Sequence, residues 1–425
     1  MMSKKIVLIL IVFLAFTQPN AEERDFFEEL EIQSQSESRR NAVRVFSTIK
    51  ETVSYSLNDR KGFKEGISQA RSYVRLGMEA QPGPHLKYRL SGVYAEDLSH
   101  TYHSDLELAD SYIDWGISDK VWLKSGRQTI AWGQSDFFQI LDRANSRDMR
   151  EFGLVGADEL RIPVAATKLS YLGNRWGMDA VILHEVRVNK LASQGKEFDF
   201  FRDLRPALTE ERTPSDTEWM MRLSANMAFG DASLIYANSF EDNPYVAHDP
   251  QKGNLYLNYL KTQTVGVSGN IVLDRAVLKA ELAYNNQSSL RAKQGSISGP
   301  TVFKPTTNLM LGVEYAPNSD RFIMVEASNT YVNNHDESVG VSESQSAIIS
   351  SLTQEFLRDE LKLFVSWGHW FEEKSDLIRI GGEYALTDDI KLGIDYIDYR
   401  ASDENALLEP FKDHDQIKTQ LTINI

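Results

Sequence analysis

Basic side chains recur at alternate positions in several stretches of the chain, each time opposite an apolar stripe. Between Ile378 and Ile380, for example, stands Arg379. If these stretches are strands, one face carries the apolar residues and the other carries the charges. Ammonium and guanidinium groups around a narrow passage lower the barrier for anions and raise it for cations. Alternation places these bases on the charged face: Lys50, Arg75, Lys87, Arg89, Lys168, Arg222, Lys279, Lys362, Arg379, Lys391 and Lys418.

Acidic residues share this face but are fewer: Glu79, Asp110, Asp114, Glu281, Glu326, Glu383 and Asp395. The whole chain nevertheless has a formal net charge of −15, so the negative charge must concentrate in the connections between strands. Two interpretations stay open. The charged face lines a lumen that favours anions, or its bases pair with the lumenal acids and hold the wall together.

A second set of charges follows the sequence Gly126-Arg127-Gln128 and extends to Arg161-Ile162-Pro163. This connection is longer than a hairpin needs, and we expect it to fold into the lumen as a constriction. The alternative is an extracellular loop knit together by its own ion pairs. Its candidate residues are Arg127, Trp132, Asp136, Asp142, Arg147, Asp148, Arg150 and Arg161.

Arg127 itself has two possible orientations. Strict alternation from Val121 aims its side chain at lipid, whereas a bulge near Ser125-Gly126 turns it into the lumen.

Catalytic patterns are weak, because the chain has no Gly-x-Ser-x-Gly turn, phosphate loop or His-Glu-x-x-His helix. His100, His103 and Ser104, with Asp97 and Asp105 nearby, could mark a metal or hydrolase site, but a pair of histidines in a loop is more often solvated surface. We therefore expect no enzyme, no catalytic residue, no metal and no cofactor.

The elements that must position these charges are strands with a two-residue period, such as Leu361 to Phe371 and Ile417 to Ile425. Each runs for about ten residues, which suffices for a tilted strand to cross a bilayer. The first is expected near Phe46 to Leu57. A soluble sandwich would have shorter strands. Downstream of Phe16 there is no apolar stretch of the length that a membrane-spanning helix needs.

The connections alternate between short and long, which is typical of outer-membrane barrels with short periplasmic turns and long extracellular loops. Eight tight turns predict about eighteen antiparallel strands, with both ends periplasmic. The turns are expected at 81–84, 118–119, 173–174, 230–231, 273–274, 317–320, 358–359 and 387–389. The long loops are expected at 58–71, 132–162, 186–215, 241–255, 288–304, 333–343 and 402–413, and one loop tip near 372–375 is short.

The ends and the composition complete the expected domain organisation. Lys4 and Lys5 precede an apolar run from Ile6 to Phe16, which predicts a signal peptide over 1–21. Residues 22–44 predict a periplasmic lead-in, and 45–425 predict the barrel. The chain has no cysteine, which suits passage through an oxidising periplasm, and its acidity argues against nucleic acid as a partner.

The stretch around Gly126-Arg127-Gln128 and Trp132-Gly133 resembles the alginate-export-like family of outer-membrane channels and its relatives of unassigned function. The motif match covers roughly residues 120–185. The resemblance implies an eighteen-stranded barrel in the bacterial outer membrane, whose lumen passes a substrate and whose long loops constrict it.

Residues and resemblance together predict a channel for a polar, anionic substrate, with export favoured. The expected partners are outer-membrane lipid, a polar or anionic solute or polymer, and a periplasmic or inner-membrane export component. The alternatives are a general diffusion porin for small solutes and a barrel enzyme that acts on lipid; a sheath around an electron-transfer partner would need a wider barrel.

Overall fold

The computed structural model describes residues 43–58, 65–97, 104–151, 153, 160–192, 198–199, 201, 208–249, 251–293, 301–403 and 406–425. The chain divides into Met1–Ala42 and Val43–Ile425, and all of the strands belong to the second unit. The predicted signal peptide and lead-in lie outside the described residues, apart from Val43 and Arg44. Among the residues described, no helix is long and apolar enough to span a membrane.

Within the described ranges, the named elements are strands and one short 3-10 helix near the C-terminus. In chain order they are β1 (Arg44–Ser56), β2 (Gly66–Gly83), β3 (Leu86–Asp97), β4 (Asp105–Leu108), β5 (Ser111–Ser118), β6 (Val121–Gln128), β7 (Asp148–Met149), β8 (Val164–Leu172), β9 (Trp176–Leu183), β10 (Lys190–Leu191), β11 (Leu208–Glu211), β12 (Glu218–Met227), β13 (Gly230–Phe240), β14 (Tyr245–Asp249), β15 (Asn254–Asn258), β16 (Lys261–Val272), β17 (Ala276–Arg291), β18 (Thr301–Asn318), β19 (Arg321–Val332), β20 (Ser344–Phe356), β21 (Leu361–Trp370), β22 (Ser375–Ala385), β23 (Ile390–Ala401), η3 (Glu409–Phe411) and β24 (Gln416–Asn424).

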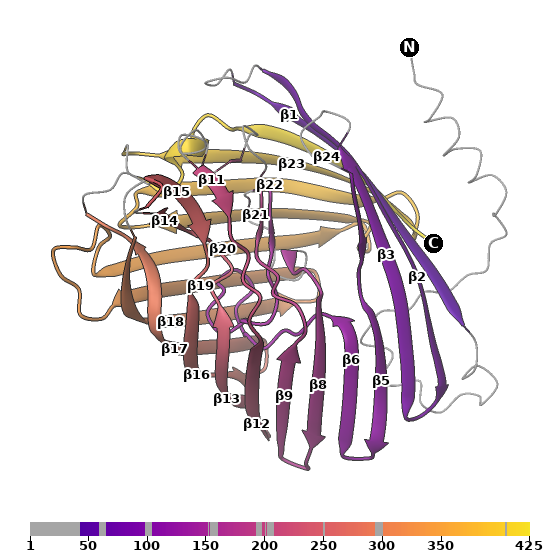
Figure 1. Cartoon of the computed structure of the whole chain (residues 1–425). Coiled ribbons are helices and arrows are strands. Elements are labelled where there is room, and N and C mark those ends of the chain that lie inside the picture. The colour runs from indigo at the N-terminus through magenta and orange to yellow at the C-terminus, as the bar shows by residue number, and fades with distance from the viewer. Residues whose placement is uncertain are drawn as a thin grey trace. The chain divides into compact units, whose positions relative to one another are not determined.

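The main sheet closes into an antiparallel barrel, because β1 pairs with β2 on one side and with β24 on the other. The sheet has 19 segments, but β4 and β5 are successive pieces of one strand, since both pair with β3. The barrel therefore has eighteen strands, as the sequence predicted. Figure 1 shows neighbours in the chain lying side by side around this wall. The short strands β7, β10, β11, β14 and β15 form two separate small sheets.

Short turns join the strands at one end of the barrel and long loops join them at the other. All eight predicted turns lie within two residues of where the sequence placed them, and the fourth is at 228–229 rather than 230–231. Most long loops lie close to the predictions, and the short tip is at 371–374. The loops expected at 58–71 and 288–304 are shorter, because β2 begins at Gly66, β17 extends to Arg291 and β18 begins at Thr301. In a barrel of this kind the short turns lie in the periplasm and the long loops outside the cell.

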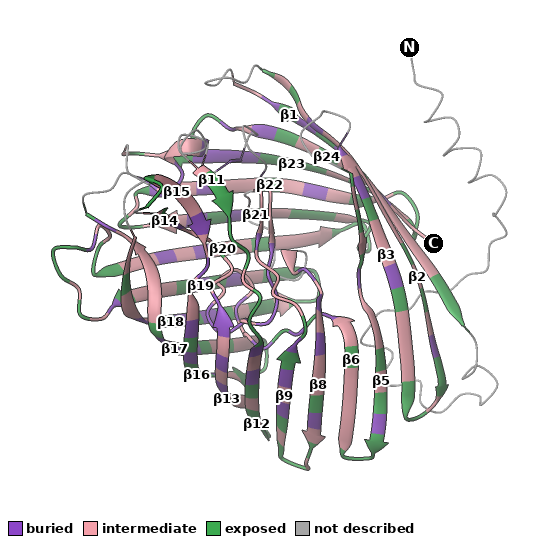
Figure 2. Ribbon diagram, in the orientation of Figure 1, coloured by how far each residue is buried: buried purple, intermediate pink, exposed green. Residues whose placement is uncertain are grey.

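The outer surface is an apolar belt. Large side chains from well-separated strands are exposed on it, among them Leu76 (60% exposed), Ile113 (56%), Leu311 (55%) and Ile380 (50%). Figure 2 shows buried residues alternating with exposed or partly exposed ones along β9. Exposing so large an apolar surface to water is unfavourable, whereas contact with lipid is favourable. The belt and the closed barrel place this protein in the bacterial outer membrane.

A bulge interrupts the strand formed by β4 and β5. Arg89 pairs with Tyr112 but Gly92 pairs with Leu108, so one extra residue lies on the β4–β5 side. A bulge of this kind re-aims the side chains that follow it. As a result Glu107 and Asp110 both face the interior, while Leu106 and Ile113 face lipid.

Candidate functional site

In the connection between β6 and β8, the described residues 129–151, 153 and 160–163 fold into the barrel, and we call them the inner loop. Glu281 on β17 accepts hydrogen bonds from the backbone N–H groups of Gln134, Ser135 (2.9 Å) and Leu141 (3.2 Å). Both ends of this contact are buried, with Glu281 1% exposed and Leu141 0%. A single lumenal carboxylate thus satisfies three backbone donors of a loop that has left the sheet.

A second carboxylate, Glu326 on β19, holds the adjacent residues of the inner loop in the same way. It accepts from the Ser135 hydroxyl (2.7 Å) and from the backbone N–H groups of Asp136 (2.8 Å) and Phe137 (3.2 Å). Asp136 also pairs with Lys279 of β17, Nζ to Oδ2 at 2.9 Å. The start of the inner loop is therefore fixed to the wall at β17 and β19.

Further along, the inner loop reaches the opposite wall. Glu151 accepts from Lys418 Nζ of β24 at 2.8 Å, lies 3.6 Å from Arg71 of β2, and is bonded by Gln69 of β2. Burial alone would raise the pKa of Glu151, but Lys418 and Arg71 hold it at about 2, so the carboxylate stays charged.

These two anchor points lie across the bore from each other. Counting around the ring from β2 through β3, β5, β6, β8, β9, β12, β13 and β16 reaches β17 at the ninth step, which is half of the eighteen strands. The inner loop therefore bridges the lumen. Figure 1 shows the chain between β6 and β8 inside the ring of strands.

Apolar side chains of the inner loop also pack against the inner face of the wall at β12 and β13. Trp132 (4% exposed) lies in a buried cluster with Leu141, Met220 and Ile235, and the Arg222 guanidinium is 5.4 Å from its ring. Leu141 fits over Gly266 of β16, where any Cβ would overlap its side chain. The glycine makes room on the inner face of the wall for the loop to pack closely.

A second apolar cluster lies under β20 to β23. Phe137 and Phe138 pack there against Ile349 and Leu377, together with Leu408 and Phe411 from the connection between β23 and β24. That connection therefore also contributes to filling the interior. The long-loop half of the barrel is occupied by side chains from its own loops.

The charged residues of the inner loop mostly brace the loop itself. Asp142 and Arg161 form a buried ion pair (2.5 Å, side chains 3% and 5% exposed), and Arg150 pairs with Asp148 at 2.6 Å. Arg147, 6% exposed, donates to the Phe137 carbonyl at 3.2 Å. Ion pairs knit the loop, as the alternative interpretation proposed, but they do so inside the barrel.

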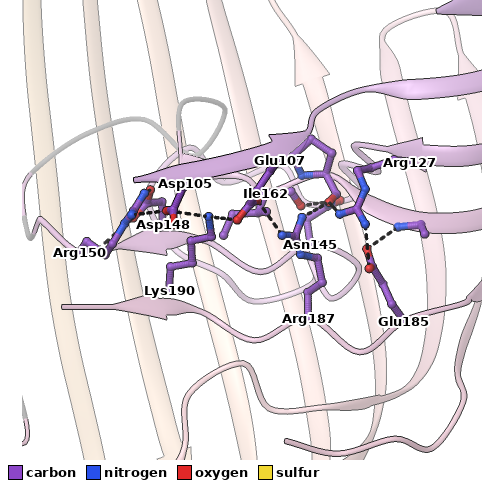
Figure 3. A network of polar contacts seen from close by, with 12 residues as sticks. Asp105, Glu107, Arg127, Asn145, Asp148, Arg150, Ile162, Glu185, Arg187 and Lys190 are labelled. Carbon is purple, nitrogen blue, oxygen red and sulfur yellow. Dashed lines mark hydrogen bonds and ion pairs between the residues drawn. The ribbon is translucent and has the colours of Figure 1, made fainter. Parts of the chain in front are cut away.

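A network of ion pairs joins the inner loop to the free edge of β4 (Figure 3). Arg150 contacts Asp105 at 2.7 Å, and Lys190 contacts both Asp105 (3.6 Å) and Glu107 (2.5 Å). Arg187 pairs with Glu107 at 2.8 Å. These contacts close the wall where β4 continues beyond the end of β6. No sequence pattern indicates them, because the partners come from three separate segments.

The structure does not bring Arg127 into the lumen. Pairing of β6 with β5 and β8 continues through Ser125 and Gly126 without a shift in register, so the prediction of a bulge that would turn Arg127 inward is wrong. The backbone at Gly126 instead has a φ of 123°, a conformation that favours glycine. Arg127 lies on the outer face at the rim, paired with Glu185 at 2.8 Å.

The predicted lumen bases all lie on the inner face, and most have an acidic partner there. Arg75 pairs with Asp110, Lys87 and Arg89 share Glu79, Arg222 pairs with Asp179, Lys279 with Asp136 and Glu314, Arg379 with Asp395, Lys391 with Glu383 and Lys418 with Glu151. Sequence reasoning missed Asp179, Glu314 and Glu151 as partners. Within the described ranges, Lys50, Lys168 and Lys362 form no ion pair.

One row on the lumen wall carries more bases than acids. The register places Lys87 opposite Asp114, Asp114 opposite Lys124, and Lys124 opposite Lys168. Lys124 lies 3.7 Å from the centre of the Tyr112 ring but, like Lys168, makes no ion pair with any described residue. Like charges directly opposite each other on neighbouring strands destabilise a sheet. Alternation from Leu123 could have identified Lys124, which the sequence analysis omitted.

Comparisons with known proteins agree with this architecture. The model of a family described as "Protein of unknown function (DUF1302)" matches residues 25–424. No curated protein matches the sequence. The alginate-export-like resemblance is not confirmed by the family match and stays a prediction.

Solved structures of similar fold include outer-membrane channels. Acinetobacter baumannii OccAB4 has a TM-score of 0.52 and 11% identity, covering 92% of this chain and 99% of its own. Pseudomonas aeruginosa OccK2 (OpdF), solved in complex with glucuronate, has a TM-score of 0.53 and 11% identity, covering 90% and 97%. Pseudomonas aeruginosa OccK11 (OpdR) has a TM-score of 0.51 and 12% identity, covering 90% and 96%. At these identities the likeness shows the fold.

Proposed function

Because the chain belongs to the DUF1302 family, whose function is unknown, we propose a function from its geometry: an outer-membrane channel that passes anionic solutes and is narrowed by its inner loop. The observation that carries the proposal is the pair Lys124 and Lys168, which lie directly opposite each other on β6 and β8, face the lumen and form no ion pair with any described residue. A wall that needed only stability would pair or separate these two charges, as it pairs Lys87 in the same row with Glu79. In a passage they attract anions.

The inner loop supports a selective channel over a general diffusion porin. It crosses the bore between β17 and β2, and its anchors are buried carboxylates rather than surface contacts. A loop fixed at both walls narrows the passage and places its own side chains beside any solute that crosses it. Export, which the resemblance favoured, stays a prediction.

The lipid-directed enzyme remains the second candidate, and one pair of residues bears on it. On the outer face, His369 Nδ1 lies 2.9 Å from Asp376 Oδ1, beside Trp367. An imidazole oriented by a carboxylate is half of an acyl-transfer site, which also needs a nucleophile within hydrogen-bond reach of the ring. In the described part of the chain, no serine hydroxyl makes a hydrogen bond to His369. The pair therefore does not favour an enzyme over the channel.

The channel is tested by recording reversal potentials across planar bilayers in a potassium chloride gradient. Wild-type protein should favour chloride. Lys124→Gln with Lys168→Gln should lower the chloride-to-potassium permeability ratio by roughly fifteenfold for each charge, since a charge about 5 Å from the ion path changes an ion's energy by about 0.8 kcal/mol in a water-filled lumen, in opposite directions for chloride and potassium. Arg321→Gln on the outer face is the matched control and should change nothing. A wild-type pore that favours potassium would refute the proposal.

A further inference from the structure

The external mouth of the barrel contains a cavity of about 530 Å³. Its lining comes from the long-loop ends of β17 and β20, from the inner loop, and from five other long-loop connections. These connections join β9 to β12, β13 to β16, β19 to β20, β21 to β22 and β23 to β24. This volume is in the range of small-molecule binding sites, which lies at about 300–1,000 Å³. The cavity is thus large enough for a ligand of drug size.

The cavity lies against the inner loop, which narrows the lumen. Met149 and Leu191 line it from the two parallel strands β7 and β10, and β7 is part of the inner loop. Leu407 lines it too, and also packs on the apolar cluster that holds Phe137 and Phe138. A ligand in this cavity would lie directly above the inner loop.

The walls of the cavity are predominantly apolar. Besides the three residues above, Phe201, Val341 and Pro410 contribute to them. Such a surface binds an apolar body and does not compensate the lost hydration of a sugar or a polyanion.

Six of the fifteen lining residues are polar or charged, and Arg291, at the end of β17, is the single base among them. Of its donors, Nη2 is bonded to the Gly340 carbonyl at 3.3 Å, and no ion pair engages it within the described residues. A planar guanidinium with donors to spare is suited to bidentate contact with a carboxylate.

Two acids in the lining affect whether a carboxylate could bind beside Arg291. Glu372 is engaged by the Ser346 backbone N–H at 2.6 Å. Burial raises the pKa of Glu373, against the opposing effect of Arg291. The pocket therefore has one carboxylate engaged by a backbone N–H, one whose charged form is disfavoured by burial, and a base with free donors.

We propose that this pocket binds a predominantly apolar monocarboxylate, with its body against Met149, Leu191, Val341 and Leu407 and its carboxylate on Arg291. The inference rests on the proposed function, because the bound anion is the solute that then passes the inner loop. It narrows the substrate class from anions in general to amphipathic carboxylates.

The test measures equilibrium binding of 2-naphthoate to the barrel in lipid nanodiscs, because detergent would compete for an apolar pocket. Neutral 2-naphthamide is the paired probe. Wild-type protein should bind naphthoate at least tenfold more tightly than naphthamide. Arg291→Gln should remove that preference, and Val341→Asp should weaken both ligands. Arg275→Gln, in the turn at the other end of the barrel, should leave both affinities unchanged.

The outcomes separate this inference from the proposed channel. Naphthoate binding that is unchanged in Arg291→Gln and Val341→Asp overturns the pocket, and equal affinity for both probes in the wild type overturns the carboxylate class. If naphthoate fails to bind while the reversal potential still favours chloride, the pocket falls and the channel stands. If naphthoate binds as expected but the bilayers carry no ion current, the channel falls and the pocket stands.

Discussion

At the scale of single residues, two carboxylates, Glu281 and Glu326, hold the loop that narrows the lumen. Glu281 and Glu326 each accept three hydrogen bonds from the inner loop, and a hydrogen bond to a charged acceptor contributes about 1.5–3 kcal/mol. We expect Glu281→Gln, Glu326→Gln and above all the double variant to release the loop from β17 and β19, because the amide turns donors toward donors. Single-channel conductance should rise severalfold in the double variant.

Glu383→Gln is the matched control for that experiment. Glu383 is also a lumenal acid, but its partner is Lys391 of the neighbouring strand and it does not touch the inner loop. Its removal should leave the conductance near the wild-type value. Equal conductance in all of these variants, with the barrel folded, would show that the two carboxylates do not hold the constriction.

The sequence predicts the orientation of lumenal side chains better than their pairing. Alternation placed Arg75 and Lys418 on the inner face correctly, because a strand turns every second side chain to the same side. It could not pair Lys418 with Glu151, since the two residues are 267 positions apart and one of them lies on a loop. For Arg127 the sequence left the orientation open, and only the register of β6 with β5 and β8 excludes the bulge.

At the scale of elements, the contact between the inner loop and the β13–β14 connection should depend on pH. Asp242 Oδ2 accepts from Gln139 Nε2 at 2.8 Å, and burial raises the pKa of Asp242 to about 7, partly opposed by Arg143. The other charged or titratable groups that face it are Asp142, Arg147, Glu218 and Tyr259. Because the pKa in the folded state is above the ordinary value, ionisation of buried Asp242 destabilises the packing of the inner loop against this connection, although the Gln139 hydrogen bond by itself favours the charged form.

This packing is most stable below the ordinary pKa of an aspartic acid, and stability is lost as the pH rises through about 7. We therefore expect the inner loop to be held less firmly at pH 8 than at pH 5.5, with larger and noisier single-channel currents at the higher pH. Asp242→Asn mimics the protonated form and should remove most of this difference. A full pH step that persists in Asp242→Asn would assign the effect to another group.

The sequence predicts the turns and strands better than the paths of the long loops. The turns were predictable because Gly, Asn, Asp and Pro mark them chemically, and the strands because their period is fixed. The inward fold of the inner loop was inferred only from its length and charges, and nothing in its sequence names Glu281 or Glu326 as anchors. The connection between β23 and β24 carried even less signal, although Leu408 and Phe411 pack in the lumen.

At the scale of the whole molecule, closure of the ring and the alternation of its connections fix the orientation in the membrane. β1 pairs with β24 from Thr48 opposite Asn424 to Ser56 opposite Gln416, so both ends of the barrel domain meet at one seam. The short turns and the two ends lie at the same side, which in outer-membrane barrels is the periplasm. The mouth pocket and the inner loop's ion-pair network then face the outside of the cell.

Single cysteines test this orientation, because the chain has none of its own and each introduced thiol reports on one position. Lys252 lies between β14 and β15 on the long-loop side, and Arg275 lies in the turn between β16 and β17. We expect a membrane-impermeant maleimide to label Lys252→Cys on intact cells within minutes. Arg275→Cys should be labelled only after the outer membrane is permeabilised, and to the same final extent. Rapid labelling of Arg275→Cys on intact cells, with Lys252→Cys protected, would mean that the barrel is inserted the other way round, and the pocket would then open to the periplasm.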